Sequence, residues 1–232
     1  LSGWGMQEVP HKRYLNDFFT GKIAESVSRG ELYNEDPITG DARFCATTAS
    51  MCGIESAGFE QNEEKKKRAV GFDLMLHAYM MVQSGIPMLY SGDEIGQVND
   101  YTYKNDPEKR VDSRYIHRRK FDWKRADGRK RKGTVQKELF DGIGKLRSIR
   151  SKEKVFDASA NVWTLDTWEN GILGVVRELE GEQMTALFNF AEEDRTAWIE
   201  EEGEYMDLYT GKKVSLQAIK MEGHSFVLAK KC

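Results

Sequence analysis

The chain has 232 residues, 39% hydrophobic and 31% charged, which is typical of a globular protein long enough to bury a sizeable core. The net charge of -3 gives no support for binding nucleic acid or an anionic membrane surface, and no apolar run approaches the roughly 18 residues of a membrane span. Three cysteines without metal-ligand spacing favour reduced thiols in a cytoplasmic protein. The first residue is Leu1 rather than Met, so the presence of a preceding segment, an export signal included, is left open.

The first 62 residues predict short helices and loops without a core of their own. From His11 to Phe19 the apolar side chains have the spacing of one helix face, and Pro10 suits a helix start. Turn-forming residues are dense from Asn34 to Asp41. The small residues from Ala42 to Met51 then predict a second short helix.

The middle of the chain has the order of an α/β unit. A largely apolar helix is predicted from Glu63 until Gly85 ends it, and the short apolar run at 86–90 predicts a buried strand. A long polar loop follows, which is typical of an active site at the carboxyl end of a barrel strand. Another helix is predicted from Val135 to Arg150. Because one strand cannot form a sheet, we expect this region to be the end of a larger barrel whose other strands lie upstream.

The basic run at 124–132, just before this last helix, favours a solvated surface turn over a binding patch.

The region from 154 to 232 consists of short alternating segments separated by polar turns, which predicts a small antiparallel β-sandwich. The predicted strands are Val162–Leu165, Ile172–Arg177, Met184–Phe190, Thr196–Ile199, Tyr205–Tyr209, Lys213–Leu216 and Ser225–Ala229. The tryptophans Trp163, Trp168 and Trp198 form either a sugar platform or, the reading we favour, part of the packing of core and turns. The expected fold class is therefore α/β followed by all-β.

Several segments, in the same order, resemble the alpha-amylase superfamily (glycoside hydrolase family 13) and, within it, the amylosucrases. Gly85–Glu94 resembles the last barrel strand of that family and the loop after it. Asp112–Arg118 resembles the amylosucrase segment Asp-Ser-Arg-Trp-x-His-Arg, with Tyr115 in place of Trp. His11–Phe19 and Tyr33–Arg43 resemble the long insertion after the seventh strand. The resemblance covers nearly the whole chain.

The resemblance implies the C-terminal part of a (β/α)8 barrel followed by an antiparallel β-sandwich. Residues 1–62 would be the insertion, 63–153 the last helices and the eighth strand with its loop 91–133, and 154–232 the sandwich. It also implies a retaining enzyme that cleaves sucrose, releases fructose and extends an α-1,4-glucan, using two carboxyl groups about 5 Å apart. Those carboxylates lie upstream of the matched segments in the family, so we expect no catalytic residue here and no activity from this chain alone.

The resemblance also implies four substrate-binding residues: Arg114, Asp112, Arg43 and Lys12. Arg114 would help close the glucose pocket by pairing its planar fork with an active-site carboxylate, unless it only forms a structural salt bridge with Asp112. Arg43 would contact the acceptor sugar, unless it stabilises the turn beside Asp41. Lys12 stands where amylosucrases carry an arginine, which puts the oligosaccharide contact there in doubt.

Other polar residues are expected to be structural. Asp93 and Glu94 are adjacent, so they point in opposite directions and form no catalytic pair. Cys45 and Cys52 lack a nearby base and are expected to pack, and His77 is expected to be a core histidine. The aspartates of the long loop lack EF-hand spacing, so we expect no metal and no cofactor.

The expected partners are sucrose, α-glucan and the missing N-terminal half of the barrel, with no nucleic acid and no membrane. A homo-oligomer is also expected, because an incomplete barrel exposes strand edges and apolar surface. Two alternatives remain open: a fragment of an alpha-amylase-type or sucrose hydrolase, and a non-catalytic glucan-binding module.

Overall fold

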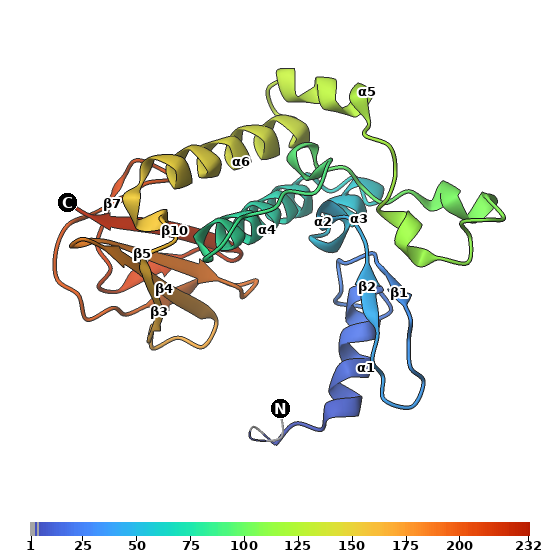
Figure 1. Cartoon of the computed structure of the whole chain (residues 1–232), viewed down its shortest axis with the longest axis horizontal. Helices are drawn as coiled ribbons and strands as arrows, with labels where there is room; N and C mark the ends of the chain where they lie inside the picture. Colours follow the sequence, from blue (N-terminus) through green and yellow to red (C-terminus); the bar gives the residue numbers. More distant parts are fainter. Residues whose placement is uncertain (1–2, 4) are drawn as a thin grey trace. The chain divides into compact units, whose positions relative to one another are not determined.

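The computed structural model describes residue 3 and residues 5–232, which form two compact units (Figure 1). The first unit contains the described residues up to 70 together with 90–137, and the second contains 71–89 together with 138–232. This grouping by contacts differs from the division at 62 and 153 that the sequence predicts, which stays a prediction. Among the residues described, no helix has both the length and the apolar character needed to cross a membrane.

The first unit is built from short elements around the hairpin-like pair β1 and β2. Its elements are α1 (Glu8–Phe19), β1 (Glu31–Tyr33), β2 (Arg43–Cys45), α2 (Thr48–Met51), α3 (Ile54–Phe59), the start of α4 (Glu63–Val82), the 3₁₀ turns η2 (Asp93–Ile95), η3 (Tyr101–Asn105) and η4 (Ser113–Ile116), α5 (Trp123–Ala126), the 3₁₀ turn η5 (Asp127–Lys130) and the start of α6 (Val135–Lys152). The helix predicted over 11–19 is confirmed as α1.

The single helix predicted over 42–51 is wrong in its first half. Arg43–Cys45 forms a strand that pairs antiparallel with β1, which the sequence did not predict. Helix α2 begins only after Thr47, whose hydroxyl accepts a hydrogen bond from the Ser50 N–H at 3.3 Å. Thr47 is therefore an N-cap that separates strand from helix.

The second unit contains an antiparallel sheet, as predicted for the C-terminal region. Its six strands have the order β3-β4-β5-β10-β7-β8, and β6 pairs separately with β9. The strands are β3 (Asn161–Leu165), β4 (Ile172–Leu179), β5 (Glu182–Asn189), β6 (Arg195–Ala197), β7 (Tyr205–Asp207), β8 (Lys213–Val214), β9 (Ile219–Met221) and β10 (Ser225–Lys231), preceded by the 3₁₀ turn η6 (Lys154–Phe156). Each of the seven predicted strands is confirmed, and only β9 was not predicted.

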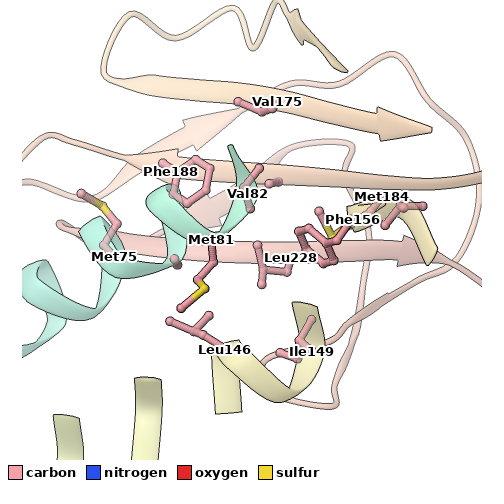
Figure 2. Packing of buried hydrophobic residues seen from close by; sticks show 13 residues of the cluster. Met75, Met81, Val82, Leu146, Ile149, Phe156, Val175, Met184, Phe188 and Leu228 are labelled. Atoms are coloured by element: carbon pink, nitrogen blue, oxygen red, sulfur yellow. The ribbon is translucent and has the colours of Figure 1, made fainter. Parts of the chain in front are cut away.

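Alternation along the central strands gives the sheet two buried faces. Met184 and Phe188 of β5 pack with residues of α4 and α6, while Leu187 packs on the other side with residues of β6 and β9. Figure 2 shows Met81 of α4 lying between Leu228 of β10 and Leu146 of α6. This period of two is what a sheet covered on both faces requires.

Two arginines cap the C-terminal end of α4, which has no basic residue of its own in its last turn. The side chain of Arg177 donates to the carbonyl of Val82 at 2.8 Å, and Arg150 donates to those of Gln83 (3.1 Å) and Gly85 (2.7 Å). The last carbonyls of a helix lack intrahelical partners and carry its negative end, so guanidinium groups satisfy them well.

The buried strand predicted at 86–90 is not formed in this structure. The segment belongs to no strand, and the side chains of Ile86 and Met88 are 90% and 80% exposed. A strand buried on both faces needs neighbours for its N–H and C=O groups, and no strand among residue 3 and residues 5–232 pairs with it. The barrel portion of the predicted fold is thus not confirmed.

Candidate functional site

The 3₁₀ turn η4 holds Arg114 through a single carboxylate. Asp112 caps the turn by accepting the N–H of Arg114 at 3.0 Å. The same carboxylate also accepts two bonds from the guanidinium, Nε to Oδ1 at 2.8 Å and Nη2 to Oδ2 at 2.7 Å. The backbone and side chain of Arg114 are therefore fixed together, and the structural ion pair foreseen as an alternative is present.

The β1–β2 pair brings Arg43 to the same end of the unit. The guanidinium of Arg114 lies 4.3 Å from the ring centre of Tyr33, and Ser113 Oγ donates to the Leu32 carbonyl at 2.8 Å. Arg43 is directly opposite Tyr33 in the strand register, which places both side chains on one face. The side chain of Arg43 is exposed and forms no ion pair with any residue that the structure describes. Tyr33 thus has the Arg114 guanidinium over its ring and Arg43 as its cross-strand neighbour.

The pair with Arg114 lowers the pKa of Asp112 to about 2. A carboxyl whose pKa is lower in the folded than in the unfolded protein stabilises the fold at pH values above its ordinary pKa of 3.8. This contribution is lost as the pH falls towards 2. We expect Asp112→Asn to remove that part of the pH dependence. Unfolding by urea, followed from pH 6 to about pH 2, should show the wild type and D112N converging at the acid end. The matched control Glu35→Gln, an exposed carboxyl, should leave the slope unchanged, and an unchanged slope in D112N would contradict the assignment.

Lys12 belongs to an ionic contact between α1 and the turn at 34–41. Its ammonium lies 2.6 Å from a carboxylate oxygen of Glu8 and 2.6 Å from one of Asp41. Asn16 reinforces this contact by donating to the Gly40 carbonyl at 3.1 Å. Asp41 thus pairs with Lys12, so the alternative in which Arg43 stabilises this turn through Asp41 is not realised. An oligosaccharide contact at Lys12 stays a prediction.

A buried amide at Asn99 organises the start of the long loop, and the sequence did not point to it. Asn99 Oδ1 accepts the Thr47 N–H at 2.9 Å, its Nδ2 donates to the Arg29 carbonyl at 2.5 Å, and its own N–H donates to Ser50 Oγ at 3.0 Å. Ser50 Oγ in turn donates to Glu55 Oε2 at 2.5 Å. The only sequence signal is a lone Asn in a polar loop, because its partners lie 49 to 70 residues away.

The adjacent carboxylates Asp93 and Glu94 shape their own loop, as expected. Asp93 Oδ2 accepts the Tyr90 N–H at 3.3 Å and Glu94 Oε2 accepts the Gly92 N–H at 2.9 Å. Each carboxylate turns back on the backbone beside it, which is how Asp and Glu stabilise turns.

The cysteines and the histidine of the apolar helix are also structural. Cys45 and Cys52 are buried, and burial raises the pKa of the Cys45 thiol. His77 is buried in α4, where its Nδ1 lies 2.9 Å from the carbonyl oxygen of Asp73. The predicted packing roles of these three residues are confirmed by their burial.

The arrangement of short helices, long loops and an antiparallel C-terminal sheet is the fold found in part of alpha-amylase-type enzymes. The chain is similar to an Anoxybacillus alpha-amylase, with a TM-score of 0.50 and 22% identity, over 71% of this chain and 32% of that one. It is also similar to AmyP in complex with maltotriose, with a TM-score of 0.57 and 14% identity, over 71% and 35% of the two chains. No family model matches the sequence. At these identities the likeness establishes a shared fold, and the matched part is about a third of each structure.

Proposed function

We propose that this chain is the C-terminal part of a retaining glycoside hydrolase of the alpha-amylase family, and that the whole enzyme is an amylosucrase-like glucosyltransferase acting on sucrose and α-1,4-glucans. The observation that carries this proposal is the guanidinium of Arg114, aligned by Asp112 and stacked on Tyr33, in a chain that shares its fold with amylases. In the proposal the catalytic carboxylates come from outside these 232 residues, so the chain alone is inactive.

The geometry of Arg114 supports a role in closing a sugar pocket. A guanidinium has five N–H donors, and Asp112 engages only the edge formed by Nε and Nη2. Tyr33 covers one face of the group, which limits its rotation. The edge at Nη1 remains for a pocket carboxylate or a sugar hydroxyl, and Arg43 on the same ribbon face would contact the acceptor sugar.

The exposed segment at 86–90 supports the same proposal. The apolar side chains of Ile86 and Met88 are largely exposed, and no strand in the described part of the chain pairs with the segment. In the whole enzyme it would pair with neighbouring parallel strands as the last strand of the barrel.

The isolated chain is therefore expected to self-associate through this segment. Light scattering should show oligomers for the wild type, and the double variant Ile86→Ser, Met88→Ser should shift the population towards monomer. A matched pair of exposed polar residues, changed to alanine, should not. A monodisperse wild-type monomer would contradict this expectation.

The proposed activity is tested on the whole enzyme with sucrose. Transferase activity gives more fructose than free glucose together with an α-glucan product, whereas equal glucose and fructose without polymer would establish the hydrolase alternative. We expect Arg114→Lys to lower kcat/KM about 10- to 100-fold, equivalent to about 1.4–2.7 kcal/mol, because lysine lacks the fork. Arg110→Lys, an exposed change in the same loop, is the control. Wild-type activity in R114K would remove Arg114 from the site.

A second candidate function is glucan binding by the C-terminal sheet, and the tryptophans favour it. The expectation that they pack in core and turns is wrong for their side chains, since Trp168 and Trp198 are 69% and 56% exposed. Their backbones are neighbours, because the Trp198 N–H donates to the Thr167 carbonyl at 2.9 Å. Exposed indole rings stack well on sugar rings. Affinity electrophoresis of the full chain in glycogen should show retention that Trp168→Ala with Trp198→Ala abolishes, and absence of retention in the wild type would exclude this function.

A further inference from the structure

The first unit contains a cavity of about 600 Å³ that the proposed sugar-transfer site does not use. The side chains that matter for its chemistry are Glu55, Phe59, Lys66, Asn99, Tyr101 and Arg125. We propose that this cavity binds the phosphate monoester of a sugar, with Arg125 and Lys66 on the phosphate and the aromatic walls against the sugar ring. The inference goes beyond the proposed glucosyl transfer and does not depend on it.

Arg125 is the main reason to expect an anion. Its Nε donates to the Ile95 carbonyl at 3.3 Å, and no carboxylate in the described part of the chain forms an ion pair with it. The group is partly buried, and this burial lowers its pKa. Asp122 offsets part of this charge through space, but the same carboxylate also lies 3.6 Å from Arg119. A partly buried guanidinium that lacks a directly bonded counter-ion is unfavourable, and a bound phosphate would relieve that cost through bidentate hydrogen bonds.

The surroundings of Arg125 add positive charge. It belongs to the run 124–132, in which six of nine residues are Lys or Arg and one is Asp. The run leads directly into Gly133 and Thr134, which line the cavity. Such a concentration of one sign beside a concave site attracts anions and raises their rate of association. Most of the run is exposed, as expected from the sequence, and Arg125 is the residue of the run that lines the cavity.

Lys66 adds a second cation to the cavity wall. It lies 2.5 Å from Glu63, whose side chain is largely exposed. An exposed ion pair at this helical spacing contributes little, so the ammonium can exchange this partner for a phosphate oxygen.

The remaining wall suits a sugar rather than a bare phosphate. The Glu55 carboxylate already accepts hydrogen bonds from Ser50 Oγ at 2.5 Å and from the Tyr101 hydroxyl, and its other lone pairs can accept from a sugar hydroxyl. Phe59 and Tyr101 are both exposed aromatic side chains in the wall. The volume is within the about 300–1,000 Å³ of small-molecule sites and larger than phosphate needs.

Calorimetric titration of the full 232-residue chain with four probes tests the proposal. The probes are glucose 6-phosphate, adenosine 5′-monophosphate, inorganic phosphate and glucose. We expect at least one sugar phosphate to bind at least about tenfold more tightly than glucose and than inorganic phosphate, a difference of about 1.4 kcal/mol. The stronger of the two sugar phosphates distinguishes a hexose from a nucleoside as the source. Equal binding of glucose and both sugar phosphates, or no binding of either at about 10 mM, would overturn the proposal.

Three variants separate the site from general surface charge. Arg125→Gln and Lys66→Gln each remove one cavity cation, and Arg110→Gln removes an exposed cation of the same unit that does not line the cavity. We expect R125Q to weaken sugar-phosphate binding at least about tenfold and K66Q several-fold, with R110Q within about twofold of wild type. Circular dichroism checks the fold of each variant, and K66Q carries the test if R125Q does not fold. Equal weakening by all three variants would mean non-specific attraction and would overturn the site. These outcomes involve no turnover, so failure here leaves the proposed transferase untouched.

Discussion

Replacing Arg177 by methionine is expected to lower the free energy of unfolding of the second unit by about 3–5 kcal/mol. The side chain is only 1% exposed and donates to three backbone carbonyls, those of Val155 at 2.6 Å, Val82 at 2.8 Å and Asp157 at 3.2 Å. Methionine fills part of the volume but donates nothing, so buried carbonyls at the end of α4 and around η6 lose their partner. Each buried acceptor left unsatisfied costs about 1–3 kcal/mol.

The measurement is urea unfolding followed by circular dichroism, with Arg147→Met as the matched control. Arg147 is exposed on α6, so the same chemical change there should alter stability by less than about 0.5 kcal/mol. Arg177→Lys should fall between the two, because one ammonium cannot reach carbonyls that a planar fork reaches together. If R177M were as stable as R147M, the hydrogen bonds from Arg177 of β4 to η6 and α4 would not stabilise the unit.

Arg177 also shows where sequence reasoning ends. The strand Ile172–Arg177 was predicted from alternation and is confirmed within β4, yet an arginine at the end of such a segment is normally read as exposed. Its acceptors lie at 82, 155 and 157, up to 95 residues away, in elements whose approach no local pattern encodes. Helix α6 and the strands were predictable from their periodicity, and α4 from its long, largely apolar run, because in each case the element's own residues determine it.

In the candidate site, too, contacts between residues close in sequence could be predicted, whereas contacts between distant elements could not. The pairing of Asp112 with Arg114 spans two residues and could be foreseen as a structural alternative, but the stacking on Tyr33 could not, since it depends on the β1–β2 pair. The prediction of a buried strand at 86–90 was wrong for a different reason. The apolar run of this segment predicted a strand, but a strand needs hydrogen-bonding neighbours, and pairing is a property of the whole sheet rather than of the segment.

Replacing Asn99 by alanine is expected to lower the free energy of unfolding of the first unit by about 2–4 kcal/mol. The change leaves the Thr47 N–H and the Arg29 carbonyl, both partners of a buried amide, without that partner. Asn99→Asp should be at least as harmful, because a carboxylate oxygen would then face the Arg29 carbonyl where an N–H now donates. Asn105→Ala, an exposed change within η3, is the matched control and should alter stability by less than about 0.5 kcal/mol.

The effect of N99A should extend beyond stability to the Arg114 group. The next residue, Asp100, donates its N–H to the Ile116 carbonyl at 2.8 Å, and Ile116 ends the turn that holds Arg114. Losing the hydrogen bonds of Asn99 should therefore weaken the bond between Asp100 and Ile116 that holds η4 in place. Amide exchange over 100–117 should then be faster in N99A but not in N105A. Faster exchange confined to 47–50 and 99, with η4 still protected, would show that Asn99 stabilises the unit without positioning Arg114.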